Sequence, residues 1–309
     1  MAAVDDVQIL PPRDVPLDGP RAMTVRRTLP SRQRALVGGW CFLDHYGPDE
    51  VTTSGGMSVP RHPHTGLATV SWLFSGEVEH RDSTGAHVIV RPGELNLMTA
   101  GHGISHSEFS TAGTSTLHGV QLWFALPGGA RDGAPGLVHH VPEPMYVPGG
   151  IIRVFLGELL DVRSPVATPG PLTGAELLLD ADAETVLDVP PGHEHGVLLD
   201  DGDVTIDATP REPGELGYLS PGRERITIRS STGARLVLLG GEPLGEQIIM
   251  WWNFVGRTHE DIVAARERWM GEISDTPPHG DLRFGPFPRD QPAALPAPAM
   301  QGGRLKARS

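Results

Sequence analysis

Two stretches of this chain repeat each other, and such a repeat restricts the fold to two copies of one architecture. The stretch that begins at Pro92, PGELNLMTAGHGISHSE, matches PGELGYLSPGRERITIR, which begins at Pro213. Pro, Gly, Glu and Leu coincide at the start, and Gly101 meets Gly222 without a gap. Two unrelated β segments with the same turn residues are the alternative, but the ordered set of matches favours duplication. We therefore expect two similar domains in tandem.

Short apolar runs separated by turn residues fill the chain up to about residue 250. Glycine, with 39 residues, and proline, with 30, supply the turns, while the aliphatic content is too high for disorder. This spacing predicts an all-β fold of two antiparallel sandwiches or barrels. The expected strands are 67–78, 86–98, 115–126, 151–159, 175–180, 195–207 and 235–243.

One short helix is predicted near the end of the chain. Thr258 and Asp261 have the spacing of a capping box, in which each side chain accepts a hydrogen bond from the backbone of the other. Apolar residues then recur with the helical period and would form one buried face. These residues are Ile262, Ala265, Trp269 and Ile273.

Proline-rich stretches suggest where the domains divide. The sequence VPEPMYVPGG separates the two halves, and a Pro/Ala-rich segment begins near Pro277. We predict an N-terminal metal-binding domain over 1–140 and a C-terminal domain without metal over 141–276. The tail, 277–309, is expected to lie extended over the surface or to be disordered.

Charge and cysteine content narrow the partners. The net charge is −13 and the arginines are dispersed, which argues against nucleic acid because phosphate binding needs clustered basic residues. No apolar run is long enough to span a bilayer, and the acidic N-terminus does not resemble a signal peptide. Cys41 is the only cysteine, so no intrachain disulfide can form, as is typical of a reducing compartment. We expect a cytoplasmic protein without direct contact to nucleic acid or membrane.

Two pairs of polar residues carry the chemistry. His62 and His64 stand two residues apart, and His106 and Glu108 repeat this spacing further along. On a strand, residues two apart lie on the same face. If the two strands face each other across a barrel, three nitrogens and one oxygen converge, a donor set that suits a first-row divalent ion. One histidine pair alone would more often be structural, but two pairs favour a metal site.

The second half of the repeat serves as an internal control. In the ungapped alignment, Thr227 and Arg229 take the places of the second histidine–glutamate pair. A guanidinium group cannot replace a carboxylate ligand. His193, of the pair His193 and His195, stands nine residues before Gly202, whereas His62 stands fourteen before the matching Gly76. The pair therefore does not occupy the equivalent place, and we interpret it as a turn or a weak exposed chelate. The second domain is therefore predicted to bind no metal.

Several segments of the chain resemble the pirin family, whose members are metal-binding bicupins. The resemblance spans roughly residues 25–127 and rests on FLDHYGP, HPHTGLATVSWLFSGEVEHRDSTG, PGELNLMTAGHGISHSE and HGVQLWFALP, with a later likeness in MWWNFVGRTHEDIVAARERWMGE. It implies one divalent metal ion, usually iron, in the N-terminal barrel. The ligands that it implies are His62, His64, His106 and Glu108.

Three more histidines lie in segments that match the family. His45, His80 and His102 are predicted to orient the ligand imidazoles or to line the pocket. Holding turns together is the alternative role for them. Ala68 stands where pirins generally have a glutamate that does not bind the metal, so the pocket loses an acidic group.

The resemblance also implies two possible functions. Pirin-like proteins often show quercetin 2,3-dioxygenase activity, with Fe(II) as Lewis acid and template for O2 and with Glu108 as general base. The substrate would be a flavonol or a smaller chelating hydroxy-ketone. The alternative is a non-enzymatic, redox-responsive regulator that acts through protein partners. The same donor set also tolerates nickel, manganese, cobalt or zinc.

Overall fold

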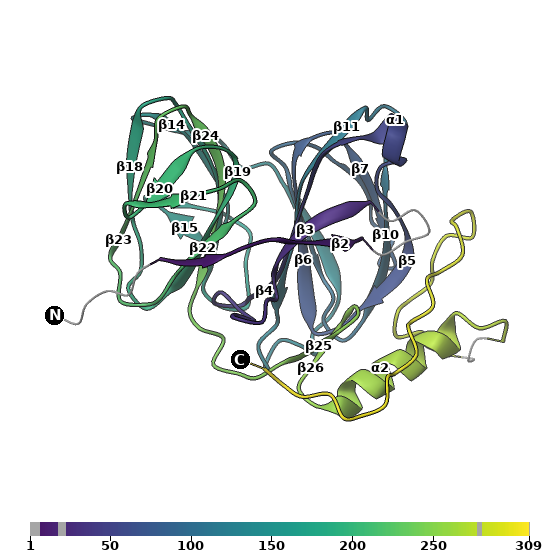
Figure 1. Ribbon diagram of the computed structural model, residues 1–309. Helices are drawn as coiled ribbons and strands as arrows, with labels where there is room; N and C mark the ends of the chain where they lie inside the picture. Colours follow the sequence, from purple (N-terminus) through teal and green to yellow (C-terminus); the bar gives the residue numbers. More distant parts are fainter. Residues whose placement is uncertain (1–6, 18–22, 277–279, 309) are drawn as a thin grey trace.

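The computed structural model describes residues 7–17, 23–276 and 280–308, and about half of these residues form strands (Figure 1). Two barrels lie side by side, and in the described chain each combines a seven-stranded sheet with a four-stranded sheet. All neighbouring strands in these sheets are antiparallel. The predicted fold class, two tandem cupin barrels with a short C-terminal helix, is confirmed.

The first barrel is formed by strands from the first half of the chain. Its large sheet has the order β12-β9-β6-β11-β4-β3-β2, and its small sheet has the order β5-β10-β7-β8. The strands are β2 (Arg13–Pro16), β3 (Thr24–Leu29), β4 (Trp40–Glu50), β5 (Ser58–His64), β6 (Leu67–Ser75), β7 (Val78–Asp82), β8 (His87–Val90), β9 (Leu95–Thr99), β10 (Ile104–Ser110), β11 (Thr116–Ala125) and β12 (Gly136–His140).

The second barrel repeats this arrangement. Its large sheet has the order β1-β22-β19-β24-β17-β14-β13, and its small sheet has the order β18-β23-β20-β21. The strands are β1 (Gln8–Leu10), β13 (Met145–Val147), β14 (Gly150–Leu156), β17 (Leu172–Leu179), β18 (Ala183–Asp188), β19 (Glu194–Gly202), β20 (Val204–Ile206), β21 (Thr209–Arg211), β22 (Leu216–Leu219), β23 (Arg225–Ser230) and β24 (Ala234–Gly241).

Smaller elements complete the described chain. They are the hairpins β15 (Glu158–Leu159) with β16 (Val162–Arg163) and β25 (Ile249–Trp251) with β26 (Phe254–Gly256), the single-turn helix α1 (Val51–Ser54), and helix α2 (His259–Glu272). The predicted helix is confirmed as α2. Its capping box is formed by Thr258 and Asp261, and it buries Ile262, Ala265 and Trp269.

The two large sheets pack against each other and form the main core. One cluster joins apolar residues of β4, β6, β9 and β11 to residues of β19, β22 and β24. Trp72 of β6 stacks on Phe155 of β14, with ring centroids 4.6 Å apart. These strands are buried on both faces, which explains why they read as nearly continuous apolar runs in the sequence. Each barrel then has a further core between its own two sheets.

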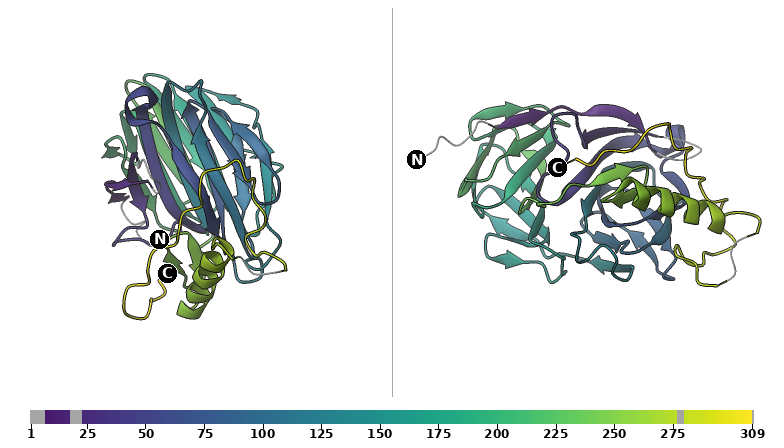
Figure 2. Two further views of the ribbon diagram at one scale, coloured as in Figure 1. Left: turned by 90° about the vertical axis from the view of Figure 1, so that its right-hand side faces the viewer. Right: turned by 90° about the horizontal axis from the view of Figure 1, so that it is seen from below.

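Both ends of the described chain connect parts that are distant in sequence. Strand β1 precedes the first barrel in sequence but pairs with β22 of the second. The segment after α2 runs beside the first barrel (Figures 1 and 2), where the amide of Leu295 donates to the carbonyl oxygen of Arg61 and Phe284 is fully buried. The domain limits 1–140, 141–276 and 277–309 stay a prediction. Strand β1 lies within 1–140 in the sequence, although it belongs to the second barrel.

Candidate metal centre

Strands β5 and β10 bring the two predicted pairs together. They are antiparallel neighbours, and His106 lies directly opposite His62 in their register. The register shifts before Glu108, which faces Val59, and bulges of this kind re-aim side chains next to functional sites. Pro63 is tolerated between the two histidines because β5 is an edge strand of its sheet.

Three imidazoles converge inside the first barrel. Ligand nitrogens of His62, His64 and His106 all lie within 4.8 Å of one another, and the side chains are buried. The Nε2 atoms of His64 and His106 are 3.0 Å apart. Two ligands at right angles on a metal with bonds of about 2.1 Å would be about 3 Å apart, so this spacing matches coordination to one ion.

Backbone carbonyl groups orient two of the rings. His62 Nδ1 lies 2.9 Å from the carbonyl oxygen of Pro60, and His64 Nδ1 lies 3.1 Å from that of Asn253. A carbonyl only accepts, so each Nδ1 carries the proton and each Nε2 keeps a free lone pair. This is the usual outer arrangement of a metal-ligating histidine.

Glu108 is held at the edge of the histidine group. Its carboxylate, His80 and His106 form a second group of ligand atoms within 4.8 Å. The hydroxyl of Ser71 donates to Glu108 Oε1 over 3.1 Å and lies 2.9 Å from Gln121 Oε1. That hydroxyl has one hydrogen, so a Gln121 amide turned to present its N–H would leave it for Glu108.

Burial sets the charge of these groups. It lowers the pKa of His62 to about 4 and holds the pKa values of His64 and His106 well below the ordinary 6.5. It also raises the pKa of Glu108. The imidazoles are therefore neutral near pH 7 and can donate lone pairs, while a buried carboxylate needs a cation beside it.

The four residues open into a cavity of about 320 Å3. Phe42 and Trp123 stack with their ring centroids 4.0 Å apart and form one wall. Trp252 and Asn253, from the turn of the β25–β26 hairpin, form another. The cavity therefore combines a polar floor with apolar and aromatic walls, as small-molecule sites do.

The donor set fits a first-row divalent ion. Three neutral nitrogens and one carboxylate give a single negative charge, and two rings have fixed outer hydrogen bonds. The arrangement resembles an open metal site, because all four donor residues line the cavity. The assignment of His62, His64, His106 and Glu108 as ligands stays a prediction, and the geometry supports it.

His80 and His102, both predicted to support the site, lie in different surroundings. His80 is buried with Nδ1 3.4 Å from Nδ1 of His106, and its Nε2 lies 3.3 Å from Asp82. It can orient the His106 ring. His102 is exposed on the turn before β10 and is not among the residues that line the cavity. A pocket role for His102 therefore has no support in this geometry.

His45, predicted to lie near the pocket, lies instead at the junction of the two barrels. Asp200 Oδ1, on β19, is 2.6 Å from Nε2 of His45 and 2.6 Å from Nε2 of His118. Arg235 approaches the other oxygen of Asp200, and Arg26 approaches His45. Side chains of β4 alternate between its two faces: Leu43 lies in the core between the barrels, on the face that carries His45, and Tyr46 lies in the core of the first barrel. His45 is therefore not among the residues that line the cavity.

This junction group is a poor metal site, although its three donor atoms lie close together. Two arginine side chains already bring positive charge to it. The Nδ1 atom of His45 is buried and has no hydrogen-bond partner within the described part of the chain, in contrast to the Nδ1 atoms of His62 and His64. The group is better described as a hydrogen-bonded link between the barrels.

The pairing of strands corrects the ungapped repeat by one residue. Glu108 faces His80 across β10 and β7, and Ile228 faces Ile206 across the equivalent strands. Ile228 is therefore the residue of the second barrel that is equivalent to Glu108, and Arg229 points outward to Glu184. The equivalent pairs, first barrel then second, are His62 and Leu187, His80 and Ile206, His106 and Ile226, and Glu108 and Ile228.

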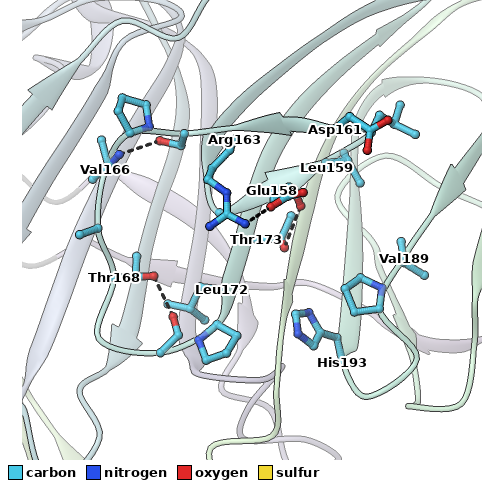
Figure 3. Close-up of a pocket in the computed structure, with 18 of the residues that line it drawn as sticks. Glu158, Leu159, Asp161, Arg163, Val166, Thr168, Leu172, Thr173, Val189 and His193 are labelled. Carbon is cyan, nitrogen blue, oxygen red and sulfur yellow. Dashed lines mark hydrogen bonds and ion pairs between the residues drawn. The ribbon is translucent and has the colours of Figure 1, made fainter.

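A larger cavity of about 1030 Å3 lies in the second barrel, between the β15–β16 hairpin and the loops after β16 and β18 (Figure 3). Its charged residues are largely paired, as Arg163 is with Glu158. His193 enters from a separate segment, and no group of three ligand atoms forms there among the described residues. The histidine cavity of the first barrel is therefore the stronger candidate site.

The fold and the site define a tandem cupin protein with a candidate metal centre in the first barrel, and comparisons identify the family. A model described as Pirin matches residues 22–124, and one described as Pirin C-terminal cupin domain matches 174–272. A Pseudomonas aeruginosa protein, provisionally named a quercetin 2,3-dioxygenase, is 41% identical over 90% of this chain and 86% of its own. A pirin-like protein of Caulobacter vibrioides is 33% identical over 85% of this chain and 92% of its own.

A solved structure is similar to this chain over nearly its whole length. A quercetin 2,3-dioxygenase from Acinetobacter baumannii superposes with a TM-score of 0.90 at 36% identity and covers 97% of both chains. The chain belongs to the pirin family. Among the described residues, no helix combines the length and the apolar character needed to cross a membrane.

Several residues of the site were not found from the sequence. Ser71 lies on β6, Gln121 and Trp123 lie on β11, and Trp252 lies in the turn of the β25–β26 hairpin, so only the folded chain brings them together. Asn253 contacts His64 through its backbone carbonyl oxygen, so the type of its side chain does not indicate this contact in the sequence. The likeness in the late segment that contains this turn was the only pointer to it.

Proposed function

We propose that this protein is an Fe(II)-dependent dioxygenase of the quercetin 2,3-dioxygenase type. The observation that carries the proposal is the set of three neutral imidazoles and one buried carboxylate at the floor of an aromatic-walled cavity. The names of the relatives support the same activity class. A bound iron would supply Lewis acidity and a template for O2.

The residues of the chain would position a flavonol or a smaller hydroxy-ketone. The stacked pair Phe42 and Trp123 offers an aromatic wall for a planar ring. Glu108 would take the proton of the substrate hydroxyl group, and burial favours this because it raises the pKa of the carboxyl group. Ser71 would hold the receiving carboxylate by its hydrogen bond to Oε1.

The test is oxygen uptake after anaerobic loading with Fe(II). We expect uptake that depends on quercetin or a simple hydroxy-ketone and is abolished in His106→Ala. His87→Ala is the matched control, since this histidine is half exposed and pairs with Glu79 outside the cavity. Stoichiometric iron without any substrate-dependent uptake would contradict the proposal and favour a redox-responsive regulator.

A further inference from the structure

Two arginines face each other at the wall of the histidine cavity. Arg13 of β2 and Arg27 of β3 are direct cross-strand partners, and both line the cavity. Like charges directly opposite on neighbouring strands repel each other. The pairing therefore needs compensation by negative charge.

One buried carboxylate compensates one of the two arginines. Asp44 accepts from Nε and Nη2 of Arg27, at 2.6 and 2.7 Å, and its side chain is fully buried. The described hydrogen bond of Arg13 goes instead to a neutral group, the carbonyl oxygen of Pro30, at 2.6 Å. Burial and the charge of Arg27 lower the pKa of Arg13, although its guanidinium stays protonated. Asp44 also opposes the lowering of the Arg13 pKa, but two guanidinium groups and one carboxylate leave this part of the wall with surplus positive charge among the described residues.

The surplus charge lies beside a surface for a flat ring. The guanidinium carbon of Arg27 is 4.3 Å from the centroid of the Phe42 ring, and Phe42 stacks in turn on Trp123. Pro16 and Leu17 extend the apolar wall next to Arg13. A planar ligand on this wall would meet cationic donors, while its chelating group faces the histidines.

We infer that the natural substrate is an acidic, planar hydroxy-ketone whose carboxylate is bound by Arg13 and Arg27. This rests on the proposed function in that the hydroxy-ketone end is the part directed to the metal centre. A guanidinium offers planar, forked N–H donors that match a carboxylate, and an uncharged flavonol would leave that match unused. The inference therefore distinguishes acidic substrates from neutral ones at the same site.

The test compares two ligands that differ in one substituent. Comenate and kojic acid share a 5-hydroxy-4-pyranone ring, with a carboxylate at position 2 in the first and a hydroxymethyl group in the second. Binding to the Fe(II)-loaded protein under anaerobic conditions is followed by quenching of tryptophan fluorescence. We expect comenate to bind about three- to fivefold more tightly, the range of a partly exposed ion pair, and expect added salt to reduce the preference.

Arg13→Gln is the decisive variant, because Arg13 is exposed and its loss should not disturb folding. The preference for comenate should disappear, so that the two compounds bind about equally, because the wall loses its surplus charge. Arg225→Gln removes the same charge from an exposed pair with Asp188 in the second barrel and should keep the preference.

Equal binding of the two compounds by the wild-type protein, a preference that survives in Arg13→Gln, or no binding of either compound would each overturn the inference. Oxygen uptake with quercetin is a separate readout. A comenate preference without uptake would contradict the dioxygenase and leave the acidic ligand class standing, whereas uptake without the preference would do the reverse.

Discussion

The two barrels share one scaffold and differ in what fills it. The first holds three imidazoles and a carboxylate around a cavity of about 320 Å3. At the equivalent places the second buries Leu187, Ile226 and Ile228 in an aliphatic core. Aliphatic side chains stabilise a fold when buried, whereas buried polar donors cost free energy unless a partner satisfies them. The first barrel therefore buries polar side chains around a cavity at these places, where the second buries aliphatic side chains that stabilise its fold.

The difference between the two interiors is tested most strongly by placing the carboxylate of the first barrel in the second. Ile228→Glu would bury a charge among aliphatic residues without a partner, and we expect a loss of about 5 kcal/mol in the free energy of unfolding. Urea denaturation measures it. Arg229→Gln, next in sequence but half exposed, should change stability by less than about 1 kcal/mol. A fully stable Ile228→Glu protein would show that the second interior is not packed as described.

Removal of metal should affect the first barrel. A ligand at about a thousand times its Kd adds about 4 kcal/mol of stability, so chelation of the iron-loaded protein should lower the Tm. Differential scanning calorimetry with and without chelator measures this shift. In His106→Ala, the Tm should no longer respond to iron. A Tm that responds to iron equally in the wild type and in this variant would place the metal elsewhere.

The junction between the barrels should make the protein sensitive to acid. Burial lowers the pKa of His45 below 6.5. As the pH falls below 6.5, His45 therefore takes up a proton in the unfolded state before it does so in the folded state, and the free energy of unfolding decreases. Burial alone would raise the pKa of Asp200, but hydrogen bonds from His118 and His45 outweigh it and lower that pKa below 3.8, so its contribution is lost in more acidic solution. The neighbouring Arg26 opposes protonation of His45, and Arg235 favours the Asp200 carboxylate.

The corresponding variant is Asp200→Asn, which removes the charge that both histidines share. We expect a loss of about 2–3 kcal/mol at pH 7 and a weaker dependence of stability on pH below 3.8. Urea denaturation across the pH range measures both. The exposed residue Asp188, changed to Asn, is the control because its ion pair is surface-exposed. An unchanged pH profile in Asp200→Asn would contradict the role of this link.

We expect a smaller change when the hydrogen bond to the Glu108 carboxylate is removed. Ser71→Ala removes the hydroxyl that donates to the carboxylate, and a hydrogen bond of this kind contributes about 1 kcal/mol. We expect kcat to fall about fivefold while iron content is retained. Ser75→Ala, on the same strand but bonded to the carbonyl oxygen of Thr116, should leave kcat unchanged. Loss of iron in Ser71→Ala would show that the serine supports binding rather than proton transfer.

The sequence predicted what depends on local spacing. Strand-sized apolar runs and the capping box of Thr258 require only neighbouring residues, and the fold class and α2 agree with them. The same-face pairs at His62 and His106 likewise follow from strand geometry, and the barrel brings them opposite each other.

The rest depends on packing between distant segments. The contact of His45 with Asp200 joins residues 155 positions apart, and nothing in the sequence near either indicates it. The ungapped repeat placed Arg229 opposite the glutamate, and only strand pairing showed that the inward residue is Ile228. A one-residue slip exchanges the two faces of a strand, so similarity of turns alone cannot fix which side chains point inward.

We propose binding of one metal ion to the histidine group of the first barrel. Its most direct test is the metal-to-protein ratio, measured by mass spectrometry after loading with Fe(II) and removal of free metal. We predict about one ion per chain in the wild type and in Asp200→Asn, and almost none in the double variant His64→Ala, His106→Ala. Iron retained by the double variant, or lost in Asp200→Asn, would contradict the account.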